Sequence, residues 1–288
     1  MSGPRFAIST FLFHQTRLDR EHLVEIAAHG FDSVELFALR SHFDYGDPRA
    51  VAQLAEWLDD TRLALSAVHA PTAEAYTDGH WHGTLSVAST DPAARARAVE
   101  ETRATLQLAR TLPYTSLATH VGVPSHLPAA ADDDARAARE SLDILANAAA
   151  DCGVQLALEV QTNRLSTPEA LVALIEEASD WPPVGICLDA GHARLMGDPA
   201  DAVETASGHI IAAHVHDTRG TRDDHLVPYD GVIDWDRTLL TFQKVGYLGP
   251  WTFELGPSAP SAQVLARAAE ARRRFEQALG LDDEQTIP

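Results

Sequence analysis

The chain has 288 residues and a formal net charge of −20 at pH 7, with 45% hydrophobic and 22% charged residues. This composition is typical of a folded globular protein with ample apolar material for a core, and the length suits one α/β barrel. The negative charge disfavours nucleic acid and anionic membrane as partners, because both bind basic surfaces.

The N-terminal apolar run is too short for a signal peptide, and no stretch approaches the ~20 apolar residues of a membrane span. Cys152 and Cys187 lie in or beside apolar segments and lack the CxxC spacing of a redox or zinc motif. We therefore expect two buried thiols without a disulfide, and a cytoplasmic protein that does not bind a membrane.

Short apolar runs alternate with amphipathic stretches, beginning with a β-rich run at 6–13 and a helical pattern that starts after Thr16 and stops at Gly30. Asp91 and Pro92 form a typical helix start. The later runs are predicted as strands at 33–37, 64–70, 115–121, 154–160, 184–189, 210–216 and 251–255. The later amphipathic stretches are predicted as helices at 47–61, 91–112, 132–151, 167–178, 199–207, 235–245 and 261–279.

Residues 71–90 interrupt this alternation, because they show no sustained period and contain Gly, His and Trp. We interpret them as a long loop over the mouth of the scaffold, and such loops often act as lids. Trp81, between His80 and His82, would give the lid an apolar surface with polar tips that suits carbohydrate stacking.

Eight strand–helix units in strict alternation predict a parallel sheet covered by helices, which closes most naturally into a (β/α)8 TIM barrel, with residues 1–288 as a single domain. In that fold the active site lies at the carboxyl ends of the strands. A doubly wound open sheet is the alternative, although it would normally place polar residues at only a few strand ends. The sequence contains neither GxGxxG nor GxxxxGK(S/T), so nucleotide-binding folds have no support.

Residues that can bind a metal ion stand at or just after the predicted strand ends. A single histidine there is more often structural than a ligand, but here seven candidates share one end of the barrel. The carboxylates of Glu159, Asp189 and Glu254 would repel one another unless a cation lay between them. With His214 as fourth ligand they predict a site for zinc, manganese, cobalt or magnesium. The seven candidates are His69, His120, Glu159, Asp189, His192, His214 and Glu254.

Seven short motifs allow a more specific comparison of the sequence with known families. They are HAP at 69–71, HVG at 120–122, LEV at 158–160, CLDAGH at 187–192, HVHD at 214–217, DDHLVPYDGVIDW at 223–235 and FEL at 253–255. Their spacing resembles the xylose-isomerase-like barrel superfamily, which contains sugar and sugar-phosphate isomerases and epimerases, inosose dehydratases and endonuclease IV. The resemblance covers nearly the whole chain and is specific for fold and metal, but not for substrate.

The resemblance to the epimerases implies one divalent ion, often manganese, held by four residues, with His192 in contact with substrate hydroxyls. The four positions are Glu159, Asp189, His214 and Glu254. The resemblance to endonuclease IV implies a trinuclear zinc site that uses these four residues and five more. The five further positions are His69, His120, His192, Asp223 and His225. Sugar-acting relatives carry several of these residues too, so a second metal and a substrate contact both stay open for the five.

Arginines in the predicted mouth loops are few and stand among acidic residues. They are Arg164, Arg194, Arg219 and Arg222. A nuclease grips the DNA backbone largely through Lys and Arg clusters, so this number suits a small phosphate or carboxylate better than a duplex. A solvated surface position is the simplest interpretation of each.

Three further residues are candidates for substrate binding. Arg222 is one, and His14, after the first strand, fits either the pocket or a structural role. Glu35 ends the second strand, where either a substrate contact or a salt bridge to a neighbouring loop fits it.

Our primary hypothesis is a divalent-metal-dependent isomerase or epimerase of a small polyhydroxylated carbonyl compound. The ion would stabilise an enediolate while Glu159 and Glu254, as acid and base, face the reacting carbons from two sides. The alternatives are a trinuclear zinc phosphodiesterase, a dehydratase or lyase with the same enolate chemistry, and a sugar-binding protein without catalysis. About three zinc ions per chain would favour the phosphodiesterase and about one ion the isomerase. Related barrels often pair into dimers or tetramers, so we also consider a homo-oligomer.

Overall fold

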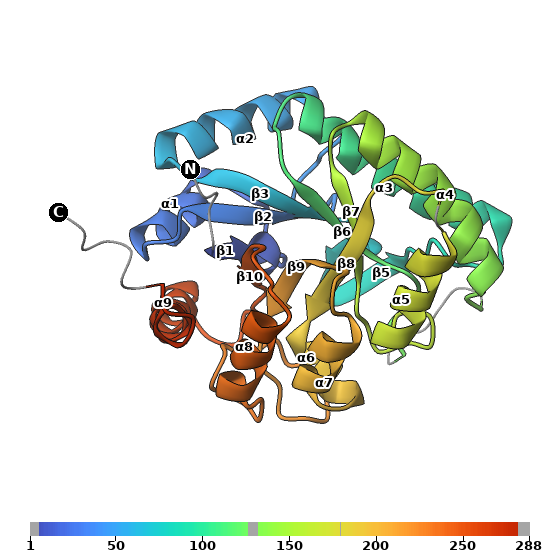
Figure 1. Ribbon diagram of the computed structural model, residues 1–288. Helices are drawn as coiled ribbons and strands as arrows, with labels where there is room; N and C mark the ends of the chain where they lie inside the picture. Colours follow the sequence, from blue (N-terminus) through green and yellow to red (C-terminus); the bar gives the residue numbers. More distant parts are fainter. Residues whose placement is uncertain (1–5, 126–131, 179, 282–288) are drawn as a thin grey trace.

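Eight parallel strands close into a barrel in the computed structural model of the protein, which describes residues 6–125, 132–178 and 180–281. The strand order around the barrel is β1-β10-β9-β8-β7-β6-β3-β2, and every pair of neighbours is parallel. Helices cover the outside of this ring (Figure 1). The predicted (β/α)8 barrel is therefore confirmed.

The barrel strands are β1 (Phe6–Ser9), β2 (Ser33–Phe37), β3 (Ala64–His69), β6 (Ser116–His120), β7 (Gln155–Glu159), β8 (Val184–Asp189), β9 (Ile210–Val215) and β10 (Trp251–Phe253). The α-helices of the described residues are α1 (Arg20–Ala28), α2 (Pro48–Thr61), α3 (Pro92–Gln107), α4 (Ala135–Asp151), α5 (Pro168–Glu177), α6 (Ala190–Met196), α7 (Pro199–Thr205), α8 (Trp235–Lys244) and α9 (Ser261–Ala278). Short 3-10 helices, η1 (Thr10–Phe13) and η2 (Leu108–Arg110), follow β1 and α3. Within the described ranges, no helix has both the length and the apolar character needed to cross a membrane.

Several helices begin at a repeated sequence signal in which a capping residue precedes a proline. Asp91 accepts a backbone hydrogen bond at 2.8 Å, and Pro92 then fixes the first turn of α3. The same arrangement begins α2, α5 and α7, at Asp47, Thr167 and Asp198. Proline lacks an N–H that the first turn would leave unpaired, and its fixed φ suits a helix, so these pairs mark where the helices start.

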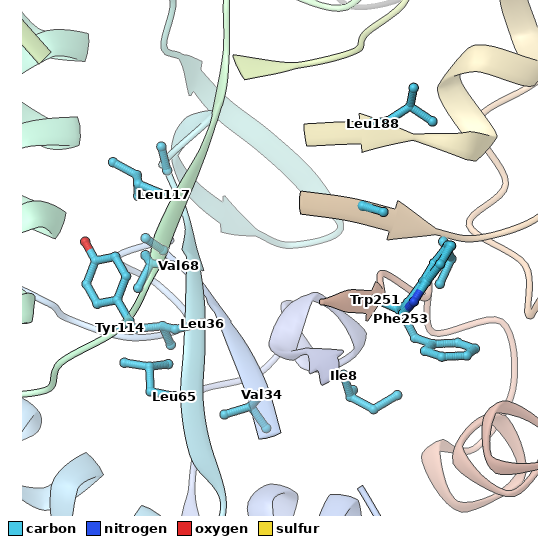
Figure 2. Close-up of a cluster of buried hydrophobic side chains, with 14 of the residues drawn as sticks. Ile8, Val34, Leu36, Leu65, Val68, Tyr114, Leu117, Leu188, Trp251 and Phe253 are labelled. Carbon is cyan, nitrogen blue, oxygen red and sulfur yellow. The ribbon is translucent and has the colours of Figure 1, made fainter. Parts of the chain in front are cut away.

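The main hydrophobic core lies between the barrel and its helices. Figure 2 shows part of it, including Ile8, Val34, Leu117 and Leu188, each at most 1% exposed. Full burial of such a side chain contributes about 1.5 to 3 kcal/mol, so this layer is the main source of stability.

The inner face of the barrel changes character along the strands. A cluster of small buried side chains fills part of it, namely Ala118, Ala157, Cys187 and Ala212. Because side chains alternate between the two faces of a strand, the residue two positions further on faces the same side. Those residues are His120, Glu159, Asp189 and His214. The strands therefore deliver ligand-type groups to the inside of the barrel at its carboxyl end.

Segment 71–90, predicted as an irregular loop, contains an antiparallel hairpin of β4 (Ala73–Thr77) and β5 (His80–Thr84), so that prediction was wrong. Asp78 and Gly79, between the two strands, have φ angles of 53° and 80°, as in the two-residue hairpin turns that favour Asp-Gly. The turn signal was present in the sequence. The strands beside it are largely exposed, however, and lack the apolar alternation on which the prediction relied.

Two smaller differences occur at strand ends. β1 stops at Ser9, and residues 10–13, predicted as strand, form η1. Helix α6 was not predicted, because it is short and follows β8 directly. Asp189 ends β8 and also caps α6, since its carboxylate accepts a hydrogen bond from the backbone N–H of His192 at 2.6 Å.

Candidate active site

Four ligand-type side chains meet inside the carboxyl end of the barrel, and we call them the strand cluster. They are Glu159, Asp189, His214 and Glu254. Glu159 and Asp189 end β7 and β8, His214 lies on β9, and Glu254 follows β10 directly. One donor atom from each lies within 4.8 Å of the others, and every member is at most 3% exposed. The four residues predicted to share one ion are therefore neighbours in space.

Several buried atoms of the strand cluster have no hydrogen-bond partner in the described structure. They are Glu159 Oε1, Asp189 Oδ2 and His214 Nδ1. An unpaired buried polar group costs about 1 to 3 kcal/mol, and carboxylates this close also repel one another. A divalent cation would give these atoms a partner and balance their charge, and carboxylate oxygens with one imidazole suit zinc, manganese, cobalt or magnesium. The cluster therefore fits a divalent ion.

Glu35, predicted as a possible substrate contact, lies against the strand cluster and not on the cavity lining. Its Oε2 accepts a hydrogen bond from His214 Nε2 at 3.0 Å, and both residues are 1% exposed. A proton on Nε2 leaves the Nδ1 lone pair of His214 facing the cluster, as in the carboxylate–histidine pairs of metal sites. In the structure Glu35 therefore orients His214, and a substrate contact of Glu35 stays a prediction.

Three histidines surround the Glu159 carboxylate. His69 Nε2 and His120 Nε2 lie 2.9 Å and 3.3 Å from Glu159 Oε2, and His192 Nδ1 lies 3.3 Å from Oε1. Burial alone would raise the pKa of Glu159, but the neighbouring imidazoles, His120 foremost, hold this pKa well below its usual range. Burial alone would lower the pKa of His69, but the Glu159 carboxylate raises it to about 9. Glu159 is therefore an ionised carboxylate held among hydrogen-bond donors.

A second group, which we call the loop cluster, consists of His192, His216, Asp223 and His225. Asp223 Oδ2 lies 3.1 Å from His192 Nε2 and 3.2 Å from His225 Nε2. His216 Nε2 and Asp223 Oδ1 are buried without a hydrogen-bond partner in the described structure. Sequence analysis named three of these residues and missed His216. Its position two residues after His214, on the same face of the chain, was the signal that could have found it.

His216 is seated tightly between neighbouring segments. Its ring stacks on His225 with centroids 4.0 Å apart, and its Nε2 lies 3.0 Å from Asp189 Oδ1. A Cβ built at Gly191 would lie 2.0 Å from His216 Cε1, so a side chain there would displace the imidazole. The glycine of the CLDAGH motif therefore gives His216 its room.

Asp217 fastens the loop that carries Asp223 and His225. Its carboxylate is fully buried and accepts four hydrogen bonds of 2.9 to 3.2 Å. The donors are the backbone N–H groups of Thr218, Tyr229 and Ile233 and the indole N–H of Trp235. The Asp217 carboxylate therefore joins both ends of the loop, in addition to the backbone bridge between Asp217 and Leu226.

A cavity of about 200 Å³ opens above both clusters. Its polar lining includes His69, His120, Gln161, His192, Asp223, His225 and Glu254. Its apolar lining includes Phe11, Phe37, Trp81, Leu85 and Pro124. Sequence analysis missed Gln161, although it stands two residues after Glu159 and thus on the same face of the chain. The volume admits one small molecule.

The remaining predicted substrate contacts differ in their positions. Trp81 lines the cavity from β5 and is 36% exposed. His14 is not on the lining and stacks against Trp81, with centroids 5.1 Å apart. Arg222 is not on the lining either, because its side chain is 77% exposed and its guanidinium lies 3.5 Å from Asp224. In the structure His14 supports an aromatic side chain and Arg222 forms a surface ion pair, and their substrate contacts stay predictions.

Comparisons with known proteins identify the family and the fold. A family model described as xylose isomerase-like TIM barrel matches residues 23–276. Protein MJ1311 of Methanocaldococcus jannaschii is 28% identical over 262 residues, which cover 87% of this chain and 83% of that protein. The L-ribulose-5-phosphate 3-epimerase UlaE of Salmonella paratyphi A is 27% identical over 246 residues, which cover 84% of each chain.

Solved structures show the same barrel. A D-tagatose 3-epimerase-like protein has a TM-score of 0.76 at 24% identity, with 98% of this chain and 100% of that chain covered. An L-ribulose 3-epimerase has a TM-score of 0.74 at 22% identity, with 99% and 100% covered. At these identities the likeness concerns the fold, whereas the family model spans most of the chain. The protein belongs to the xylose isomerase-like TIM barrel family.

Proposed function

We propose that the protein is a divalent-metal-dependent epimerase or isomerase of a small polyhydroxylated carbonyl compound. The observation that carries the proposal is the pair of buried carboxylates, Glu159 and Glu254, in one ligand-type cluster, of which Glu254 lines a small cavity. The relatives support it, because the Salmonella protein is named as an epimerase of a sugar phosphate and a solved neighbour as an epimerase of L-ribulose.

Proton transfer falls to the two glutamates. A divalent ion bound at the strand cluster would supply positive charge that stabilises the enolate form of the substrate. Glu254 lines the cavity after β10, and Glu159 ends β7, and the two strands β9 and β8 lie between them in the ring. The carboxylates thus approach from different strands. One removes a proton from the carbon next to the carbonyl, and the other returns a proton to the opposite face.

Neighbouring residues would orient the substrate and exclude water. His192 and Gln161 both line the cavity, and His192 Nε2 lies 3.3 Å from Gln161 Nε2 and 3.1 Å from Asp223 Oδ2. A substrate oxygen would bind these side chains by replacing one of those contacts. The apolar lining displaces water, which strengthens charge interactions at the reacting carbons. The cavity therefore combines polar side chains that can bind the substrate with an apolar lining that excludes water.

Metal content and proton exchange together test the proposal. Mn²⁺-loaded protein should hold about one ion per chain by atomic emission. In D2O it should place deuterium on the carbon next to the carbonyl of a ketose, and NMR of the product separates an epimer or isomer from a dehydrated product. Absence of exchange into D-fructose, D-tagatose and L-ribulose by the loaded protein would contradict the proposal.

The loop cluster favours a second candidate, the trinuclear zinc phosphodiesterase. It supplies a second set of four ligand-type side chains, two of which have an unpartnered buried atom. About three zinc ions per chain and cleavage of bis(p-nitrophenyl) phosphate would support this candidate. About one ion per chain without cleavage would contradict it.

A further inference from the structure

We infer that the substrate is an unphosphorylated sugar whose uncharged end rests on an aromatic wall of the cavity. This inference rests on the proposed function and specifies its substrate class. The aromatic wall is defined as Phe11, Phe37 and Trp81, which line the cavity together.

Three separate elements build the aromatic wall. Phe11 lies on η1, Phe37 ends β2, and Trp81 lies on β5 of the hairpin. The ring centroids of Phe11 and Phe37 are 5.0 Å apart, and those of Phe37 and Trp81 are 6.2 Å apart, both in edge-on contact. These are favourable aromatic distances, so the wall is already assembled without a ligand.

His14 and Tyr76 hold the wall from behind. The His14 ring stacks on Phe11 at 4.6 Å and on Trp81 at 5.1 Å, and Tyr76 meets Trp81 edge-on at 4.9 Å. Burial lowers the pKa of His14, so its imidazole is neutral at pH 7 and adds no cation to the wall. Trp81 is therefore fixed in place although it is partly exposed. Such a surface suits the C–H groups of a sugar and offers no charge-assisted bond to a phosphate.

The polar side of the cavity also disfavours a phosphate. Its acidic lining residues are Asp223 and Glu254, and the other ionisable residues on the lining are histidines. Two lining histidines each face a carboxylate, His69 facing Glu159 at 2.9 Å and His225 facing Asp223 at 3.2 Å. These imidazoles are therefore already paired with negatively charged groups. Sugar hydroxyls can donate to carboxylates, whereas a phosphate dianion would be repelled by them.

The arginines of the mouth loops face other groups. Arg219 and Arg222 both lie 3.5 Å from Asp224, and their side chains are 65% and 77% exposed. Arg164 donates to the backbone carbonyl of Asp133 at 2.5 Å. Among the residues that the structure describes, no lysine or arginine lines the cavity. The chain therefore differs in expected substrate from its Salmonella relative, which is named for a sugar phosphate.

Paired substrates that differ only in the phosphate provide the test. Mn²⁺-loaded protein in D2O is given L-ribulose or L-ribulose 5-phosphate, and D-fructose or D-fructose 6-phosphate, and deuterium uptake is followed by NMR. We expect kcat/KM for the better free sugar to exceed that for either phosphate at least about 10-fold. A smaller ratio overturns the inference and leaves the proposed function standing. Uptake into none of the four overturns the proposed function itself.

A binding measurement gives a readout that does not depend on turnover. The chain has five tryptophans, so the fluorescence difference between the protein and its Trp81→Phe variant isolates the signal of Trp81. The better free sugar should change this difference signal in a saturable way, and inorganic phosphate should not. A response to phosphate but not to the sugar overturns the inference.

A substitution of Trp81 should also change the preference for a free sugar over a sugar phosphate. Trp81→Arg places a guanidinium on the wall and should reduce the free-sugar to phosphate ratio of kcat/KM about 10-fold. Leu248→Arg is the matched control, because Leu248 is 98% exposed and precedes β10, at the opposite end of the barrel. It should leave the ratio unchanged.

A milder variant covers the case in which Trp81→Arg does not fold. Trp81→Ala should raise KM for the free sugar several-fold while kcat changes little, because the wall binds the end of the substrate that does not react. A folded Trp81→Arg protein with an unchanged ratio overturns the inference. So does an unchanged KM in Trp81→Ala.

Discussion

The strand cluster and the loop cluster share one cavity, yet the chain builds them differently. All four residues of the strand cluster stand on barrel strands or directly after one, and they are at most 3% exposed. In the loop cluster, Asp223 and His225 come from the connection between β9 and α8, and their side chains are 15% and 13% exposed. The barrel strands thus position the whole strand cluster. In the loop cluster, Asp223 and His225 are positioned by the hydrogen bonds of one loop.

The backbone conformation at His225 shows that the loop cluster depends on the hydrogen bonds of its loop. His225 has a φ of 45°, in the left-handed region that non-glycine residues rarely adopt. Its Nδ1 donates to the backbone carbonyl of Glu254 at 2.9 Å, and Asp217 holds the loop on either side. Such strain costs on the order of 1 to 3 kcal/mol and persists only where neighbouring contacts enforce it. Damage to the strand cluster should therefore affect chemistry, and damage to the loop should affect stability.

The largest expected effect is that of Glu254→Gln in the strand cluster. The amide keeps the shape of the side chain but cannot accept a proton, so kcat for deuterium exchange should fall by about 10²- to 10⁴-fold. Isothermal titration should show that Mn²⁺ still binds. Glu177→Gln, an exposed position on α5, is the control and should retain full activity. Exchange at the unsubstituted rate in Glu254→Gln would remove Glu254 from the acid–base pair.

The strand cluster could be predicted from the sequence because its residues stand at the ends of strands, and the barrel fold fixes where those ends lie. Glu159 and Asp189 each end an apolar run, and eight such runs imply a closed ring whose ends converge. His216 was harder to find, because the predicted strand 210–216 contains two histidines and only His214 was taken as a ligand. The pairing of His214 with Glu35 spans 179 residues, and no local pattern shows which side chain a buried histidine faces.

The lining of the cavity was less predictable than its ligands. Arg222 and Gln161 both stand in loops after strands, yet Gln161 lines the cavity while Arg222 faces Asp224. Which way a loop side chain points depends on its partners, and these follow from the folded loop. The hairpin was missed for a related reason, since its strands are exposed and the apolar period that predicts buried strands is absent.

The loop cluster can be disturbed separately through Asp217→Asn. Each carboxylate oxygen accepts two of the four hydrogen bonds, so the amide NH2 group would face two of the four donors. We therefore expect the free energy of unfolding in urea to fall by about 2 to 4 kcal/mol. Hydrogen exchange should speed up across 218–235 before it does so in the barrel strands. Asp236→Asn, exposed on α8, should change the free energy by less than about 0.5 kcal/mol. Equal stability of the two variants would show that the loop is held by other contacts.

A smaller effect on the strand cluster is expected from Glu35→Gln. The neutral amide weakens the hydrogen bond to His214, so the affinity for Mn²⁺ should fall by about 10- to 100-fold in a chelator competition. Glu21→Gln, exposed on α1, serves as control and should keep the original affinity. Unchanged affinity in Glu35→Gln would mean that His214 is oriented by packing alone.

The smallest expected effect is a pH dependence of the stability, to which both clusters contribute. Burial opposes protonation of His69 and His225, but Glu159 and Asp223 raise each pKa to about 9. The unfolded value is about 6.5, so the folded state holds the extra protons. Their stabilisation is complete below about pH 6.5 and is lost as pH rises through about 9, and each kcal/mol lost lowers Tm by roughly 2 to 4 °C.

Mn²⁺ should change this pH dependence in only one cluster if a single ion binds. In a His225→Gln variant, His69 beside the strand cluster can still lose its proton as the pH rises. An ion bound to Glu159 competes with that proton, so Mn²⁺ should make the fall of Tm with pH less steep in this variant. In a His69→Gln variant the part of the slope that comes from the loop cluster, with His192 and His225, should persist with Mn²⁺ present. A slope that Mn²⁺ removes in both variants would show that the loop cluster also holds an ion, and would favour the phosphodiesterase over the epimerase.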